Sequence, residues 1–245
     1  MKTLGLIGGL SWESTLTYYR LVNEETRRRL GHLHSSRCLL YSFDFEPIAH
    51  LQTLGQWQAL SDELVGAASA LASAGAEILL VCSNTMHKVS DELEARVPLP
   101  LLHIADATGS AVRSRGIRSV ALLGTRFTME EPFLRARLED RYALHVSVPD
   151  GHDRQAIHDT IYRELCAGTI KDSSRRRMRD IIRKLTEQGV QGVILGCTEL
   201  GLLIRPEDSA VPLFDTATLH AHAAVEAALR DETREQNALE GRCGP

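Results

Sequence analysis

The sequence predicts an α/β fold with two similar parallel sheets, and two observations carry this prediction. Short apolar runs of strand length alternate with longer stretches in which apolar residues recur at helical spacing. The pattern also occurs twice, because residues 75–85 align without gaps on residues 189–199 at an offset of 114. Residues 3–9 align on residues 119–125 at an offset of 116. We therefore expect two α/β subdomains related by pseudo-two-fold symmetry, with a cleft between them.

The first half of the chain is expected to contain four strands, at residues 3–9, 38–43, 78–81 and 101–104. The first strand ends in glycines, and Ser11 beyond them is a candidate N-cap for a helix. Trp12, in the same stretch, is interpreted as a core residue. Leucines and alanines at helical spacing predict a helix over residues 57–74. A further helix is expected to begin with Asp106 as its cap, which completes a predicted N-terminal subdomain of residues 1–105.

The second half repeats the order of the first. Strands are expected at residues 119–125, 144–148, 193–195 and 211–213. A helix with an apolar stripe precedes Gly189, and the last helix opens at Asp215 and runs to about Leu229. We therefore predict a C-terminal subdomain of residues 106–214, a helix at residues 215–230 that rejoins the first subdomain, and a flexible tail at residues 231–245.

Composition and charge limit the functions to consider. Of the 245 residues, 43% are hydrophobic and 24% are charged, as in ordinary soluble globular proteins. A formal net charge of −4 gives no reason to expect nucleic acid or an anionic membrane as a partner. No apolar run is long enough to span a bilayer, and the N-terminus lacks a signal-peptide pattern. We therefore expect a cytoplasmic protein that binds neither nucleic acid nor membrane.

The chain has five cysteines, and their spacing matches neither a C-x-x-C motif nor a Cys/His metal site. The odd number and this spacing predict reduced thiols, without structural zinc or a disulfide framework. Cys38 and Cys166 lie inside apolar stretches and are interpreted as packing residues. Cys197 differs from them because it follows a glycine at the end of an expected strand, which makes it a candidate for function.

Two polar side chains follow equivalent strands of the two halves. In the repeat alignment Ser83 falls on Cys197. Ligands of parallel α/β sheets bind at the carboxyl ends of the strands. If the two strand ends face one cleft, Ser83 and Cys197 lie opposite each other. Two acid/base groups on opposite sides of one carbon can invert a stereocentre next to a carboxylate without a cofactor or a metal.

A thiol suits this proton transfer when its thiolate is favoured, as at a helix N-terminus, and Cys197 is expected in such a position. The charge of the carbanion spreads into the carboxylate of the substrate. Polar groups of the expected loops are candidates to stabilise that charge and to bind the substrate: Asn84, Thr85, Thr125, Thr128 and Thr198. Free N–H groups near Ser11 are candidates to hold a small anion. The glycines there do not match G-x-G-x-x-G, which argues against a dinucleotide.

The sequence resembles the aspartate/glutamate racemase family in four segments: GGLSWEST at residues 8–15, SNTMH at 83–87, LGT at 123–125 and GCTE at 196–199. These segments spread over residues 1 to about 230. The resemblance is closest to the enterobacterial subgroup specific for L-aspartate and L-glutamate and to broad amino-acid racemases. It implies two α/β subdomains with the active site between them, two-base catalysis without a cofactor, an amino-acid substrate and a homodimer.

Ser83 departs from the pattern of this family. Typical aspartate racemases have a cysteine immediately before Asn-Thr, whereas the subgroup that this chain resembles has threonine there. An unperturbed serine is a much weaker acid than a thiol, so the two faces of the substrate cannot be served equally. We expect Cys197 to process one enantiomer efficiently and Ser83 to support the reverse direction poorly. The resemblance implies that the preferred substrate is the L form.

Two alternatives remain open from the sequence. One is a broader amino-acid, hydantoin or maleate-type isomerase on the same scaffold. A substrate side-chain carboxylate should meet a cation, for which Arg126 is a candidate by its loop position and Lys171 a weaker one. The other alternative is a non-catalytic small-molecule binding protein that lost turnover through Ser83.

Overall fold

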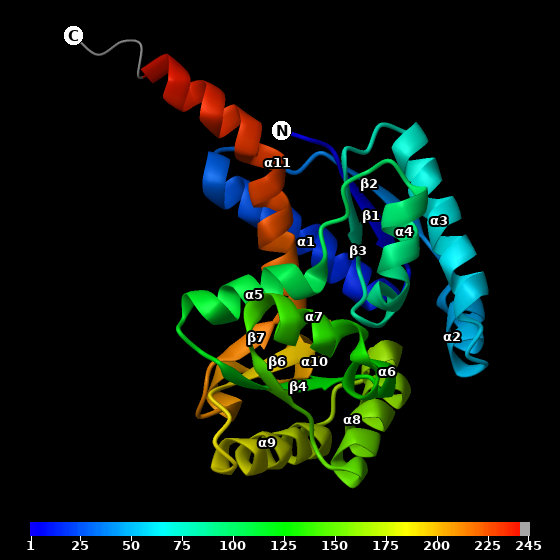
Figure 1. The fold of residues 1–245 in the computed structure, drawn as a ribbon, viewed down its shortest axis with the longest axis vertical. Coiled ribbons are helices and arrows are strands. Elements are labelled where there is room, and N and C mark those ends of the chain that lie inside the picture. The colour runs from blue at the N-terminus through cyan, green and yellow to red at the C-terminus, as the bar shows by residue number, and fades with distance from the viewer. Residues whose placement is uncertain (241–245) are drawn as a thin grey trace.

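The computed structural model describes residues 1–240 and the side chains of residues 1–230. Two parallel sheets lie in separate halves of the molecule (Figure 1). The first has the order β2 (Cys38–Ser42), β1 (Leu4–Gly8), β3 (Ile78–Val81), and the second has the order β5 (His145–Ser147), β4 (Ser119–Gly124), β6 (Gly192–Gly196), β7 (Leu213–Asp215). The prediction of two similar parallel-sheet α/β subdomains is confirmed.

The duplication extends to strand register. Leu4 of β1 pairs with Ile78 of β3. Val120, 116 residues after Leu4, pairs with Gly192, which is 114 residues after Ile78. The offsets seen in the sequence repeat are therefore the offsets between paired positions of the two sheets. As a result, the chain leaves β3 and β6 at equivalent places.

The fourth strand expected in the first half, at residues 101–104, does not form. Leu101 makes only an isolated parallel bridge with Leu79. The Leu79 N–H donates to the Pro100 carbonyl at 2.9 Å, and the Leu102 N–H donates to the Leu79 carbonyl at 3.0 Å. Helix α5 (Ile104–Ser114) begins directly afterwards. The ladder is cut short because Pro100 has no N–H and the helix leaves no further residues for pairing.

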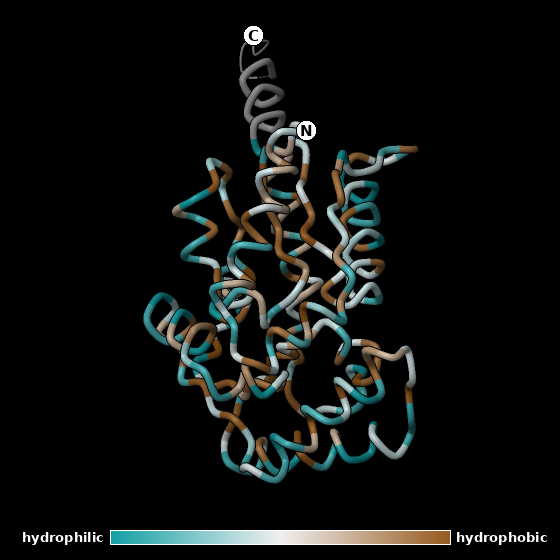
Figure 2. Tube along the Cα trace, turned by 90° about the vertical axis from the view of Figure 1, so that its right-hand side faces the viewer, coloured by the Kyte–Doolittle hydropathy of each residue, from teal (hydrophilic) through white to brown (hydrophobic). Residues whose placement is uncertain are grey.

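Helices surround both sheets. The first half contains α1 (Trp12–Leu30), α2 (Phe45–Thr53), α3 (Trp57–Ser73), the short 3₁₀ segment η1 (Thr85–Val89) and α4 (Ser90–Arg96). The second half contains α5, α6 (Arg126–Glu130), α7 (Pro132–Tyr142), α8 (Gly151–Arg163), η2 (Leu165–Ala167), α9 (Asp172–Glu187), α10 (Leu200–Leu203) and η3 (Pro206–Asp208). In Figure 2 the outer helices alternate hydrophilic and hydrophobic turns, as expected of elements with one buried face.

The last helix, α11 (Thr216–Glu240), starts at the second sheet and packs along α1 of the first half (Figure 1). Ala217, Ala221 and Ala224 share a buried cluster with Tyr18 and residues of β1 and β3. The helix continues past the expected end near Leu229. Residues 241–245 of the expected tail lie outside the described residues, so its flexibility stays a prediction, as do the subdomain boundaries.

Three local expectations are wrong. Trp12 is 62% exposed rather than in the core, because it lies on the outer face of the first turn of α1. Asp106 does not cap α5; the His103 side chain does, accepting from the Ala105 N–H, while Asp106 binds Arg137 at 2.6 Å. Ser11 occupies the N-cap position of α1 with a positive φ, but its hydroxyl forms no capping hydrogen bond.

The turn before α1 depends on glycine. Gly9 has a φ of +69°, and a Cβ there would lie 2.1 Å from the Phe43 carbonyl oxygen. The Gly9 N–H donates to the Thr15 hydroxyl at 2.8 Å. This contact, rather than Ser11, ties the end of β1 to the start of α1. Among the described residues, none of the helices is long and apolar enough to cross a membrane.

Candidate functional site

A narrow cleft opens between the two sheets at the carboxyl ends of their strands. Residues from both halves line it: Leu10, Phe45, Gln52, Ser83, Asn84 and Thr85 from the first half, and Thr125, Ile161, Tyr162, Cys166, Gly196, Cys197, Thr198 and Glu199 from the second. Its volume is about 30 Å³, comparable with the share of one water molecule in the liquid. The Tyr162 hydroxyl donates across it to Gln52 at 2.9 Å. The cleft is therefore closed in this structure.

Ser83 and Cys197 both line this cleft, as the repeat alignment predicts. Ser83 follows β3, and its Oγ accepts a long hydrogen bond of 3.4 Å from the Met86 N–H. His87 lies beneath it, with Nδ1 donating to the Ser83 carbonyl at 2.7 Å and Nε2 accepting from the Ile104 N–H at 3.2 Å. Burial lowers the pKa of His87 well below its usual value, so the ring is neutral and holds the Ser83 loop through hydrogen bonds alone.

Cys197 follows β6, which ends at a tightly packed glycine. A Cβ on Gly196 would lie 2.7 Å from the Leu122 side chain and 2.9 Å from the Leu123 carbonyl oxygen. The Cys197 thiol is buried and donates to Glu199 Oε2 at 2.9 Å. Burial and the nearby Glu199 charge raise the pKa of Cys197 well above its usual value. The structure therefore does not favour the thiolate form of Cys197, which we expected from a position at a helix N-terminus. The helix that follows, α10, has four residues and begins only at Leu200.

Glu199 is the principal site residue that the sequence reasoning missed. It is 3% exposed, and hydroxyl and thiol groups surround its carboxylate. Ser14 donates to Oε1 at 2.7 Å, Thr198 donates to Oε2 at 2.8 Å, and Cys166 lies 3.8 Å from Oε1. The available signal was an acidic residue two positions after the candidate thiol in the GCTE segment. Its partner Ser14, on α1, lies 185 residues away in sequence and carries no comparable signal.

Cys166 packs against the core of the second half, as the sequence predicts. The sequence did not predict that it also borders the cleft. It lines the cleft beside Cys197 and faces the same carboxylate. Burial, followed by the charge of Glu199, raises its pKa. Cys166 therefore lies on the same side of the cleft as Cys197, and Ser83 lies on the other side. Cys82 lies on the other side of β3 in a buried cluster with α11, as strand alternation predicts.

Threonines connect the two halves below the cleft. Thr85 and Thr125 share a hydrogen bond of 2.9 Å between their hydroxyls, and Thr128 lies 3.1 Å from the Thr125 hydroxyl. Thr85 and Thr125 line the cleft, whereas Thr128 is fully buried behind them. Thr198 lines it from the second half, as Thr125 does. Ser11 is buried next to Leu10, and its hydroxyl has no partner.

Asn84 spans the join between the halves. Its Nδ2 donates to the Thr216 hydroxyl at 2.9 Å, and that hydroxyl donates to the Leu195 carbonyl at 2.8 Å. The Asn84 Oδ1 atom is buried without a hydrogen-bond partner. A buried polar atom without a partner costs free energy unless a ligand satisfies it.

The two cations considered for a substrate side chain lie outside the cleft lining. The Arg126 guanidinium lies over the Phe127 ring at 5.4 Å. Lys171 forms an ion pair with Glu164 at 3.1 Å. Within residues 1–230 the lining includes neither lysine nor arginine. Among the residues with described side chains, Glu199 is the only charged one in the lining.

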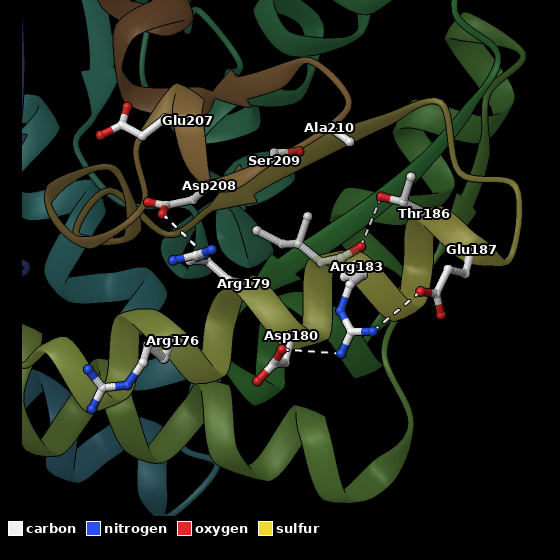
Figure 3. A pocket seen from close by; sticks show the side chains of 11 residues that line it. Arg176, Arg179, Asp180, Arg183, Thr186, Glu187, Glu207, Asp208, Ser209 and Ala210 are labelled. Atoms are coloured by element: carbon white, nitrogen blue, oxygen red, sulfur yellow. Dashed lines mark hydrogen bonds and ion pairs between the residues drawn. The ribbon is translucent and has the colours of Figure 1, made fainter.

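A larger surface groove of about 710 Å³ lies between α9 and η3 (Figure 3). None of its lining residues lines the cleft. Its charges are largely paired: Arg179 lies 3.6 Å from Asp208, and Arg183 contacts Asp180 and Glu187. Despite its size, we interpret it as a solvated ion-pair surface, because an anion there would have to displace carboxylates.

One acidic cluster in the described residues is compact enough for a cation, but it serves another purpose. Asp150, His152 and Asp153 lie close together at the start of α8. Asp150 accepts from the Asp153 N–H at 2.9 Å as the helix cap, and Asp153 binds Lys184 at 2.9 Å. These contacts explain the cluster without a metal, and none of the three residues lines the cleft.

Comparison with known proteins agrees with this geometry. The Asp/Glu/Hydantoin racemase family model matches residues 7–224. The broad specificity amino-acid racemase RacX of Bacillus subtilis is 20% identical over 237 residues, which cover 91% of this chain and 96% of RacX. A crystal structure of a Yersinia pestis protein assigned as an Asp/Glu racemase is 52% identical with a TM-score of 0.87, covering 94% of this chain and all of that one. An aspartate racemase homologue from Pyrococcus horikoshii is 36% identical with a TM-score of 0.81, covering 93% and 99% of the two chains. The chain belongs to the Asp/Glu/Hydantoin racemase family of enzymes.

Proposed function

We propose that this enzyme is an amino-acid racemase that interconverts the L and D forms of aspartate or glutamate by two-base proton transfer at Cα. One observation carries this proposal: Cys197 and Ser83 line one cleft from equivalent strand ends of the two sheets. A carbon held between these walls meets a thiol on one side and a hydroxyl on the other. Such a pair can remove a proton from one face and return one to the opposite face.

Glu199 provides the base that Cys197 needs. The thiol rests in its neutral form and already donates to Glu199 Oε2. Transfer of that proton to Glu199 produces the thiolate that attacks the Cα hydrogen, and the two groups never carry negative charge together. Ser14 and Thr198 hold the carboxylate in place for this transfer. Hydroxyl groups at Thr85 and Thr125 are available to the charged carboxylate of the intermediate.

The two directions are unequal in this proposal. Cys197 deprotonates the L enantiomer, and Ser83 supplies the proton on the opposite face. In reverse Ser83 must act as the base, although a hydroxyl is a much weaker acid than a thiol and lacks a carboxylate like Glu199 beside it. The L form is therefore expected to turn over with the higher kcat, while kcat/KM is equal in the two directions because the enantiomers have equal free energy.

Exchange of the Cα hydrogen in D₂O tests the proposal. We expect the wild-type enzyme to convert L-aspartate or L-glutamate into a D product that carries deuterium at Cα, and Cys197→Ala to lower the rate of that conversion about 10² to 10⁴-fold. Cys38→Ala, a thiol in the first sheet, is the matched control and should retain the rate. A wild-type enzyme that exchanges neither substrate, while binding one, would be a binding protein instead.

A broader amino-acid specificity is the second candidate, and the cleft lining favours it. Residues 1–230 place no cation in the lining, where a side-chain carboxylate would require one, and Leu10, Phe45 and Ile161 are apolar. A panel of aspartate, glutamate, methionine and lysine under one exchange assay separates the two. Restriction to the acidic pair supports the first candidate, whereas turnover of the apolar and basic members supports the second.

We further propose a cytoplasmic homodimer that works without a cofactor. The four cysteines with described side chains are all free thiols, which suits a reducing compartment. Trp12, Leu16 and Tyr19 are each more than half exposed along one face of α1, and an apolar stripe of this kind suits a subunit interface. Proton transfer between thiol, carboxylate and hydroxyl groups needs no electron sink beyond the carboxylate of the substrate.

A further inference from the structure

The hydrogen bonds around Thr216 have a fixed direction. Thr216 is 1% exposed and is the first residue of α11. A threonine hydroxyl has one proton, and the Leu195 carbonyl, which can only accept, takes it at 2.8 Å. Towards Asn84 the same oxygen therefore offers only lone pairs. Asn84 must therefore present its N–H₂ group to Thr216. In the structure, Asn84 Nδ2 donates to the Thr216 hydroxyl at 2.9 Å.

The consequence is a defined orientation of the amide of Asn84, which is one of the residues that line the cleft. Because Nδ2 is held by Thr216, Oδ1 must point away from it. Asn84 lines the cleft and is 3% exposed, and Oδ1 has no hydrogen-bond partner. This atom is an acceptor only, so it requires a donor from the ligand. The carboxylates of an amino acid cannot donate, whereas its ammonium group can.

We infer that Thr216 is a positioning residue that fixes the orientation of the Asn84 amide and so makes the cleft select ligands with an α-ammonium group. This inference rests on the proposed function for the identity of the ligand class. It assigns Asn84 Oδ1 to the ammonium rather than to the charged carboxylate of the intermediate. It also argues against a maleate-type substrate, which has two carboxylates and no ammonium to satisfy Oδ1.

Binding measurements with two probes of equal carbon skeleton test the inference. L-Glutamate has the ammonium group, and glutarate lacks it. We expect the wild-type protein to bind L-glutamate about tenfold or more tightly than glutarate. Thr216→Val keeps the shape of the side chain but frees the amide to turn, so it should reduce that preference about tenfold. Thr216→Ser keeps the hydroxyl and should restore the preference.

Equal binding of the two probes by the wild-type protein would overturn the inference without any variant. So would a Thr216→Val variant that keeps the wild-type preference, or one that weakens both probes equally. If Thr216→Val does not fold, the binding preference for L-glutamate over glutarate is measured with Thr216→Ala instead. The proposed function is tested separately. A protein that prefers L-glutamate but does not exchange its Cα hydrogen would support the inference and contradict the proposed racemase activity. A protein that binds neither probe loses both.

Discussion

Cys197 and Glu199 form a pair in which the thiol holds the proton at rest. The thiol is buried, and a thiolate there would lie 2.9 Å from a carboxylate oxygen. Two negative charges at that distance repel strongly in a site of low polarity. The base strength of Cys197 is therefore available only when Glu199 takes up a proton. This coupling distinguishes the site from one in which a helix N-terminus stabilises the thiolate.

Replacement of Glu199 tests this coupling. Glu199→Gln removes the proton acceptor and should lower kcat/KM with L-glutamate about 10² to 10⁴-fold near pH 7. It also removes a charge that raises the pKa of Cys197, so the thiol should ionise at lower pH than in the wild type. The residual activity should therefore rise with pH into the alkaline range, because burial still holds the pKa of Cys197 above its ordinary value and solvent hydroxide replaces Glu199. Glu207→Gln, on the surface groove, is the control; a flat pH profile for Glu199→Gln would show that the residue is merely structural.

In the proposed mechanism Ser83 is the less effective acid/base group, and a substitution by cysteine should improve it. Ser83→Cys places a thiol on the side of the cleft that deprotonates the D enantiomer in the proposed mechanism. We expect turnover of D-glutamate to rise at least about tenfold, while Ser83→Ala loses conversion in both directions. The measurement is the initial rate from each enantiomer. No rise for the D substrate would count against Ser83 as the second acid/base group.

Sequence reasoning located Ser83 and Cys197 because both lie at strand ends, and strand ends are marked by local pattern. The repeat then paired them without knowledge of the fold. Glu199 and Cys166 were missed for a physical reason: their importance comes from Ser14 and from each other, across contacts that no periodicity encodes. The direction of the Asn84 amide depends on Thr216 and Leu195 in the same way.

At the level of elements, α1 and α11 are joined by a charge cluster around the buried carboxylate of Glu25. Glu25 on α1 is 2% exposed and accepts from Arg28 and Arg29 at 2.6 Å each. His222 on α11 lies 3.8 Å away. The Arg28 hydrogen bond is the main cause that lowers the pKa of Glu25 to about 2, from its ordinary value of 4.5. The cluster therefore favours the folded state while Glu25 is ionised.

This cluster predicts a pH-dependent loss of stability. Because the folded pKa lies below the ordinary value, the stabilisation is complete above pH 4.5 and is lost as the pH falls towards 2. Glu25→Gln should cost about 1 to 3 kcal/mol of unfolding free energy at neutral pH. The difference from wild type should shrink in acid, as followed by urea unfolding. Glu24→Gln, in an exposed pair with Arg20, should cost about 0.5 kcal/mol or less. A constant difference at every pH would contradict the assignment.

Most elements were predictable because periodicity and glycine positions mark them. The expected strand at residues 101–104 failed because Pro100 and the start of α5 interrupt the ladder, although its counterpart β7 forms in the second half. The extension of α11 past Leu229 was missed because residues 231–240 are mostly polar and their sequence has no apolar stripe that would indicate a helix.

At the scale of the whole molecule, the closed cleft requires movement for substrate to enter. Its volume of about 30 Å³ is too small for an amino acid. Direct contacts hold the halves together at its edge, including Tyr162 to Gln52 and the edge-to-face rings of Trp57 and Phe127. We therefore expect the two sheets to separate during binding and to close over the substrate, which excludes water from the proton transfer.

The proposed dimer is also a property of the whole molecule. Leu16→Glu places a charge in the exposed apolar stripe of α1 and should shift the protein from dimer to monomer in sedimentation at micromolar concentration. Leu33→Glu changes an isolated leucine that is 98% exposed and should leave the assembly unchanged. A wild-type protein that sediments as a monomer, or a Leu16→Glu variant that remains a dimer, would refute this assignment of the interface.

The most direct test of two opposed acid/base groups is the position of deuterium after the first few per cent of turnover in D₂O. With L-glutamate or L-aspartate, we expect the D product to carry deuterium at Cα while the remaining L substrate keeps its hydrogen, because different groups remove and return the proton. Starting from a saturating concentration of the D enantiomer, the same pattern should appear with a lower kcat. Equal labelling of substrate and product would mean that one group serves both faces, which would contradict the assignment of Cys197 and Ser83 to opposite sides of the carbon.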